Sequence, residues 1–391
     1  MASWFSKSGP VLGVDVGSSS VKVVQVKFTG KNIAIEKIGI APIRVEGSKG
    51  ERQEVTDAVV ADAVKAAIAD SGSNLRDVCS SIAGESVIVR YLQFPDMNDD
   101  ELDYAVRLQA EEYIPFRLDE VNLDYQRLDS PTVEGGKRVN LLLVAARKDL
   151  VNRRVELLKS IGLNPVVMDV DSFALLNCLE ANYDFRSDEV VALVSIGASI
   201  TNINIFTNSI TRFARDISLA GNSISSAIAG KMNISFVEAE KIKKEEATIT
   251  AKEAAVSDSE RPGVAEAIKE TVEKITGESM SMEEKSAKIN EIIRQPIQSL
   301  ITEIRRSLQF FENQPNGKPV TRILLTGGGA KLKNLDRYMA DRLGLPVEIA
   351  DPLKKADISR VGITENLLRD QAPALAVGIG LGIRKPGDKD I

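Results

Sequence analysis

A turn rich in small residues separates two apolar runs near the start of the 391-residue chain. Glycine lets backbone N–H groups approach phosphate oxygens closely, and serine adds hydroxyl donors without bulk. Asp15 comes directly before this turn and is a hard oxygen ligand that could hold Mg²⁺ through water. The alternative is an ordinary Gly-Ser hairpin with a surface aspartate. The residues predicted to contact phosphate are Gly17, Ser18, Ser19, Ser20 and Lys22.

A second turn of the same kind follows later in the chain. Gly17 and Gly197 lie 180 positions apart, as do Ser19 and Ser199, within similar apolar patterns. This repeat indicates a duplicated α/β architecture in which each half contributes one small-residue turn. If the two turns face each other across a cleft, they can close around a triphosphate. The second turn supplies the candidates Gly197, Ala198, Ser199, Thr201 and Asn202.

Two further segments extend the predicted site. An apolar strand runs into three glycines before a helix, a pattern typical of a backbone that a ligand approaches closely. A charge run predicts a helix on which two lysine stems flank a purine while a carboxylate binds ribose hydroxyls. The alternatives are a flexible connection for the first segment and a solvated helix face for the second. The candidates are Gly327, Gly328, Gly329 and Ala330, and then Lys243, Lys244 and Glu240.

The composition narrows the chemistry that these residues can perform. The chain has no histidine, which excludes Ser-His-Asp and Cys-His catalysis and His-ligated zinc. Its two cysteines, Cys79 and Cys178, lack CxxC spacing and argue against a disulfide scaffold or a cysteine metal site. The net charge of -6 argues against nucleic acid as a partner. No apolar run approaches the ~18 residues of a membrane span, so we expect a cytoplasmic protein.

Apolar periodicity predicts the elements that would position the candidate residues. Strand hairpins are expected at 11–28 and 189–213, each carrying one of the two turns. An αββα block at 100–161 has the pattern of an inserted subdomain. A long apolar stripe at 289–311 predicts a helix, and the last helix is expected to follow Pro373.

Five segments occur in the order of the nucleotide signature of the actin, Hsp70 and sugar-kinase superfamily, which the chain resembles. They are Asp15 to Lys22, Asp169 to Leu176, Ser195 to Asn202, Thr326 to Ala330, and Pro373 to Gly380. Three phrases narrow the resemblance to the PilM family of type IV pilus assembly proteins, relatives of the cell-division protein FtsA. These are Ser-Ile-Ala-Gly at 81–84, Glu-Tyr-Ile-Pro-Phe at 112–116 and Asp-Val-Asp-Ser-Phe-Ala-Leu at 169–175.

The resemblance implies an actin-like α/β fold in two lobes, with ATP or ADP and Mg²⁺ between them. Residues 86–162 would form an inserted αββα subdomain like that of FtsA. Lobe I would comprise residues 1–85, 163–185 and 373–391, and lobe II residues 186–372, including a charged helical region at 237–312.

One departure from the superfamily pattern bears on catalysis. Many members begin the second turn with an aspartate that helps to organise Mg²⁺ and the attacking water, but Ser195 stands at that position here. ATP binding is therefore expected, whereas hydrolysis is expected to be weak or absent. Asp15 remains the candidate for catalysis and for holding Mg²⁺ through water, and Asp171 is a candidate for positioning water.

The resemblance also implies partners. It points to the cytoplasmic N-terminal segment of a PilN-like inner-membrane protein and to other pilus-assembly components, so that partners would hold the chain at the inner membrane. Nucleotide-linked closure of the lobes would then set its grip on that segment, and self-association is left open. The alternatives are a small-molecule, sugar-type kinase of the same superfamily and a nucleotide-independent structural docking subunit.

Overall fold

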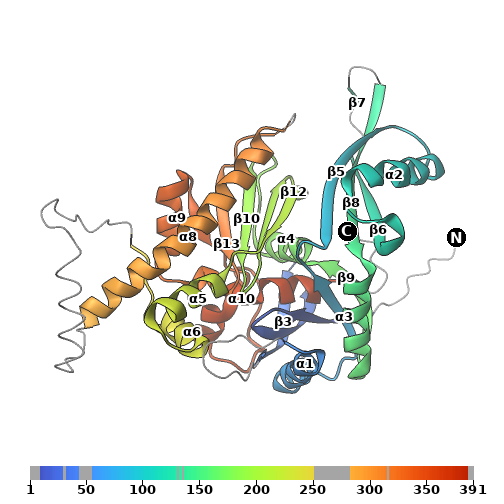
Figure 1. The fold of residues 1–391 in the computed structure, drawn as a ribbon. Helices are drawn as coiled ribbons and strands as arrows, with labels where there is room; N and C mark the ends of the chain where they lie inside the picture. Colours follow the sequence, from blue (N-terminus) through green and yellow to red (C-terminus); the bar gives the residue numbers. More distant parts are fainter. Residues whose placement is uncertain are drawn as a thin grey trace, which may run out of the picture.

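The computed structural model describes residues 9–29, 32–43, 55–129, 132–133, 136–250, 282–314 and 317–385. Two sheets of five strands form the centre of this part of the chain, and a smaller sheet stands to one side of them (Figure 1). Among the described residues, no helix combines the length and the apolar character needed to cross a membrane.

Both large sheets are built on the same plan. The first has the order β3-β2-β1-β4-β9 and the second the order β12-β11-β10-β13-β14. In each, the central strand pairs antiparallel with its hairpin partner and parallel with the strand on its other side. The topology therefore confirms the predicted duplication. The strands are β1 (Leu12–Val16), β2 (Ser20–Thr29), β3 (Asn32–Pro42), β4 (Asp77–Ile82) and β9 (Asn164–Val170), then β10 (Val190–Ile196), β11 (Thr201–Thr207), β12 (Ile210–Ile217), β13 (Arg322–Thr326) and β14 (Val347–Ile349).

Helices cover both faces of each sheet. Because side chains alternate along a strand, Leu12 and Val14 enter the core on one face of the first sheet, whereas Val11 enters the core on the other. This second core lies between the two sheets and contains helices α4 (Asp171–Asn182) and α10 (Glu365–Gly382). The outer helices are α1 (Asp57–Ser71) and α3 (Lys148–Ser160) on the first sheet, and α5 (Gly221–Met232), α6 (Phe236–Glu245), α8 (Met282–Glu312) and α9 (Leu335–Leu343) on the second.

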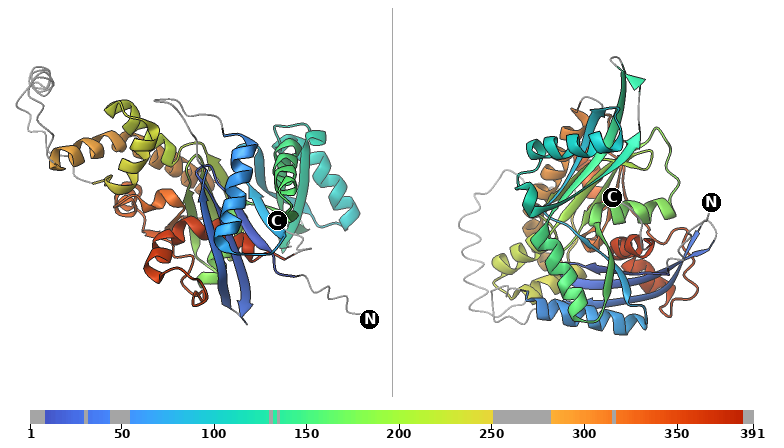
Figure 2. Two further views of the ribbon diagram at one scale, coloured as in Figure 1. Left: turned by 90° about the horizontal axis from the view of Figure 1, so that it is seen from below. Right: turned by 90° about the vertical axis from the view of Figure 1, so that its right-hand side faces the viewer.

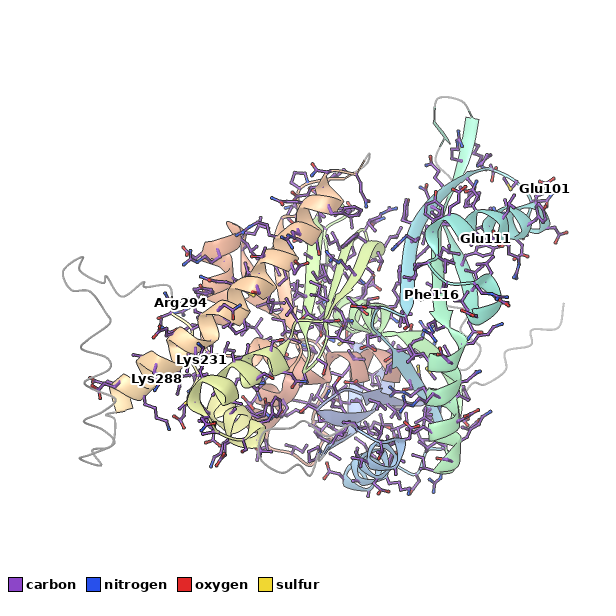
Figure 3. The ribbon with its side chains drawn as sticks, viewed as in Figure 1. Glu101, Glu111, Phe116, Lys231, Lys288 and Arg294 are labelled. Carbon is purple, nitrogen blue, oxygen red and sulfur yellow. The ribbon has the colours of Figure 1, made fainter. Side chains whose placement is uncertain are left out.

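The third sheet belongs to a block inserted between β4 and β9, and it has its own core. Its order is β5-β8-β6, and α2 begins with a capping box in which Asn98 and Glu101 exchange hydrogen bonds. Glu101 and Glu111 lie on the exposed face of α2, while Phe116 follows the helix near the base of the sheet (Figure 3). The elements are β5 (Val87–Pro95), α2 (Asp99–Tyr113), the 3-10 helix η1 (Leu118–Glu120), β6 (Val121–Asp129), β7 (Thr132–Val133) and β8 (Gly136–Arg147).

Helix α3 connects the inserted sheet to the first large sheet. It begins at Lys148, directly after β8 ends at Arg147, and runs along the first sheet (Figure 2). Leu157 and Leu158 are buried in the core that also contains Leu12 and Val14. The helix that follows the inserted sheet in the chain is therefore packed on the first large sheet.

The prediction that the last helix follows Pro373 is wrong, because α10 begins at Glu365 and contains Pro373. Proline inside a helix removes one backbone hydrogen bond. Here the surrounding turns are buried, and the Pro373 carbonyl accepts hydrogen bonds from the Thr326 hydroxyl and the Gly327 N–H, each at 2.7 Å. The long predicted stripe forms α8, with Pro296 inside it. Residues 251–281 of the predicted charged helical region lie outside the described residues.

The two central helices approach each other closely at Gly380. A Cβ atom added there would lie 1.7 Å from the Ala174 carbonyl oxygen. We therefore expect Gly380→Ala to lower the free energy of unfolding by about 2 kcal/mol, the usual scale for overpacking a core. Denaturant unfolding followed by circular dichroism measures this change.

Gly230 in α5 provides the matched control. A Cβ added there would meet nothing within 4 Å. We expect Gly230→Ala to be neutral or to stabilise by about 0.5–1 kcal/mol, because alanine costs less backbone entropy in a helix. Equal effects of the two substitutions would contradict the importance of the α4–α10 contact.

Candidate functional site

A cavity of about 700 Å³ opens between the two large sheets. This volume lies within the usual range of ligand pockets. The β1–β2 turn, the β10–β11 turn and the glycine loop after β13 all line it, together with residues of α3, α4, α6 and α10. The predicted residues that line it are Asp15, Gly17, Ser18, Ser19, Ser20, Lys22, Asp171, Gly197, Ala198, Ser199, Asn202, Glu240, Lys243, Lys244, Gly327, Gly328 and Gly329.

Two predicted residues do not line the cavity. Thr201 is fully buried, and its hydroxyl donates a hydrogen bond to the Leu219 carbonyl at 2.7 Å. Ala330 is also fully buried, in the core on the outer side of the second sheet. Both side chains therefore contribute to packing behind the pocket.

The first turn holds a partly buried ion pair. Lys22 Nζ lies 3.1 Å from Asp15 Oδ2, and the two residues are direct partners across the β1–β2 hairpin. A Cβ atom at Gly17 would lie 3.1 Å from both the lysine nitrogen and the Ser20 carbonyl oxygen. A side chain at this position would therefore be tightly packed where the turn folds back over the lysine.

The second turn lacks this ion pair because Ser195 and Asn202 occupy the matching partner positions. The Asn202 amide instead donates a hydrogen bond to Asp216 Oδ1 at 2.6 Å. Asp216 also accepts a hydrogen bond from the Gly84 N–H, which joins β12 to the segment after β4. Burial raises the pKa of Asp216, although these two hydrogen bonds oppose the rise. Sequence reasoning missed Asp216. The sequence shows it as a charged residue near the end of a predicted strand, and its pairing with Asn202 appears in the structure.

The glycine loop after β13 is shaped by close backbone contacts. Gly327 has φ of 83°, and a Cβ there would lie 2.4 Å from the Ile196 carbonyl oxygen. Gly329 is equally close to the Ile196 side chain, whereas a Cβ at Gly328 would meet nothing within 4 Å. Gly327 and Gly329 thus allow the loop to pack against β10, while Gly328 borders open space in the pocket.

The charge run forms α6, and its side chains are linked to one another. Glu240 Oε2 accepts hydrogen bonds from the Ser225 hydroxyl at 2.5 Å and from Lys243 Nζ at 2.6 Å, and Lys244 lies 3.1 Å from Oε1. Lys243 also donates to the Gly221 carbonyl at 3.0 Å. Burial alone would raise the pKa of Glu240, but the two lysines and Ser225 hold it below its ordinary value.

Two more charged groups line the side of the pocket next to the first sheet. Burial raises the pKa of Asp171, at the start of α4, to about 7, and the nearby Asp15 adds to the rise. Arg154 of α3 lines the same pocket, although the sequence showed it only as one of two arginines on a predicted helix. Its electrostatic neighbours include Asp171 and Asp15. The pocket therefore contains a cationic side chain that sequence reasoning missed.

The raised pKa of Asp171 predicts a pH-dependent cost to stability. The folded protein keeps this proton to a higher pH than the unfolded chain, whose group has the ordinary value of 3.8. The stability that the protonated group provides is thus present below about pH 4 and is lost as the pH rises through about 7. We expect Asp171→Asn to melt above the wild type at pH 8, with a gap that narrows toward pH 4.5.

Melting temperatures of ligand-free protein across this pH range measure the effect. Asp62→Asn is the control, because Asp62 is exposed on α1. Parallel pH curves for the wild type and Asp171→Asn would contradict the assignment.

Comparison with known proteins agrees with this arrangement. Residues 13–253 and 281–386 match the family described as "Type IV pilus assembly protein PilM". The structure of a "PilM-PilN type IV pilus biogenesis complex" is similar to the chain with a TM-score of 0.75 and 28% identity, covering 96% of this chain and 98% of that one.

A match to cell division protein FtsA of Buchnera aphidicola subsp. Baizongia pistaciae (strain Bp) covers a shorter stretch. It is 26% identical over 197 residues, which are 49% of this chain and 43% of that protein. This match thus spans less than half the length of that relative. The family match, in contrast, includes both turns, the glycine loop and α10. The chain therefore belongs to the PilM family of type IV pilus assembly proteins.

Proposed function

We propose that the chain is an ATP-binding scaffold of the type IV pilus inner-membrane assembly complex. The observation that carries this proposal is the meeting of both small-residue turns and the glycine loop in one pocket between the duplicated sheets. The phosphates would lie between the two turns, close to Lys22 and to backbone N–H groups of the turns. The adenosine would lie toward α6, near Lys243, Lys244 and Glu240.

The residues present fit Mg²⁺ bound together with the nucleotide. Among the residues that the structure describes, no group of three or more carboxylate, cysteine or histidine side chains could hold a metal ion by itself. Mg²⁺ often retains water and takes phosphate oxygens as ligands. Asp15 would hold such an ion through water, and the ion would neutralise phosphate charge.

The second turn supports slow or absent hydrolysis. Ser195 carries no charge at the position that matches Asp15, so the second turn offers no carboxylate at that position to organise the metal and the attacking water. Asp171 remains the candidate for positioning water. The raised pKa of Asp171 leaves it partly protonated near neutral pH, which weakens it as an acceptor.

We also propose that the chain binds the cytoplasmic N-terminal segment of a PilN-like membrane protein and is held at the inner membrane by its partners. The family membership and the resemblance to the PilM-PilN complex support this. Nucleotide would act by binding the closed and open arrangements of the lobes with different affinities. Contacts that would change on opening include Gly84 with Asp216, and Ser218 with Glu85 at 3.1 Å.

Calorimetric titration tests both parts of the proposal. Nucleotide-stripped protein is titrated with Mg-ATP and then with a synthetic PilN-like N-terminal peptide, and the peptide titration is repeated with ADP and without nucleotide. Different peptide affinities in the three states would support nucleotide-linked closure. Peptide binding without ATP binding would indicate a structural docking subunit, whereas ATP binding alone would favour a kinase. Sedimentation with and without ATP tests self-association.

Gly328 gives the most direct test of the pocket by mutation. Its position borders open space, so a larger side chain would fill room that the ligand needs without straining the fold. We expect Gly328→Leu to weaken Mg-ATP binding at least tenfold while leaving the melting temperature of the ligand-free protein unchanged. Gly362→Leu is the matched control, since Gly362 also has open space around it but does not line the pocket. Unchanged ATP affinity in Gly328→Leu would refute the site.

A further inference from the structure

Arg154 carries a polar group in the pocket that the fold itself does not satisfy. The residue lies in the second turn of α3 and lines the cavity. Its Nη1 nitrogen is shielded from solvent and, within the described part of the chain, has no hydrogen-bond partner. A buried donor without an acceptor is costly in a folded protein. A ligand oxygen in the cavity would remove that cost.

The charge of Arg154 is also incompletely balanced. Asp171 and Asp15 attract it, but among the described residues no ion pair joins Arg154 to either carboxylate. Burial outweighs this attraction and lowers the pKa of the guanidinium below its ordinary value. The group nevertheless stays charged at physiological pH, because an arginine pKa lies far above 7. An anionic ligand would balance the remaining positive charge of the Arg154 guanidinium.

The neighbours of Arg154 indicate which part of a nucleotide it would meet. Asp15 precedes the first turn, Asp171 directly follows β9, and Arg154 lies on α3, which packs on the first sheet, so all three residues line the side of the pocket next to the first sheet. The α6 residues proposed for the adenosine belong to lobe II. A nucleotide bound in that direction presents its last phosphate to the Asp15 side. A guanidinium suits this group because its planar donors can pair with two phosphate oxygens.

We propose that Arg154 binds the terminal phosphate of ATP and makes the site distinguish ATP from ADP. This inference rests on the proposed ATP binding. The position of Arg154 links the terminal phosphate to the inserted sheet, because α3 continues directly from β8. Lys148, at the start of α3, donates to the Asp119 carbonyl of the inserted block at 2.9 Å. A ligand on Arg154 would therefore act on the helix that carries that sheet.

The test compares the affinities of Mg-ATP and Mg-ADP in the full chain by calorimetry. We expect Arg154→Ala to weaken ATP binding at least tenfold and ADP binding less than twofold. Arg153→Ala is the matched control, because the neighbouring Arg153 is exposed and its guanidinium lies 2.8 Å from Asp57 on α1. This control should leave both affinities unchanged.

The outcomes separate this inference from the proposed function. If the wild type binds neither nucleotide, the ATP site itself is wrong. If the wild type binds both and Arg154→Ala loses both equally, or loses neither, the role of Arg154 is wrong. If Arg154→Ala does not fold, Arg154→Gln takes its place, since it keeps much of the side-chain length without the charge. A wild-type ratio of ATP to ADP affinity in Arg154→Gln would likewise overturn the proposal.

Discussion

The two large sheets are held together by a pair of helices packed so closely that their backbones touch. At Gly380 there is no room for even a methyl group beside α4, and a Cβ at Gly13 would lie 2.3 Å from the Gly378 carbonyl oxygen. Because protein interiors are close-packed, such a contact leaves few alternative positions for either helix. Residues of both helices line the pocket, and the glycine loop is tied to α10 through Pro373. The geometry of the site therefore depends on residues that do not line it.

The duplication is symmetric in its backbone and asymmetric in its charge. Equivalent hairpins carry Asp15 with Lys22 on one side of the pocket and Ser195 with Asn202 on the other. Asp171 and Arg154 add further ionisable groups to the side of the pocket next to the first sheet. On the other side, the two pocket lysines of α6 are paired with Glu240 of the same helix. A bound anion would thus meet different electrostatic environments on its two sides.

Local sequence patterns predict where the two turns lie, but they do not predict which side chains of each motif face the pocket. Small residues between apolar runs identified both hairpins, and their common spacing revealed the duplication. Thr201 and Ala330 belong to the same motifs but point into the packed interior, because strand register and helix packing set their orientation. Arg154 reaches the pocket from α3, far from either turn in the chain, whereas Asp216 lies on β12 beside the second turn and contacts Asn202. Pro373 has the local pattern of a helix boundary, but tertiary burial keeps the helix intact across it.

The inserted sheet occupies a place in the chain where its size can change without altering the strand order of the two large sheets. Neighbouring parallel strands always need a crossover connection, which is usually one helix. Here β4 and β9 are such neighbours, and α3 completes their crossover, so the inserted sheet is an extension of a connection that the fold requires anyway. Evolution can therefore lengthen, shorten or resurface this sheet without changing the order of the strands beneath it.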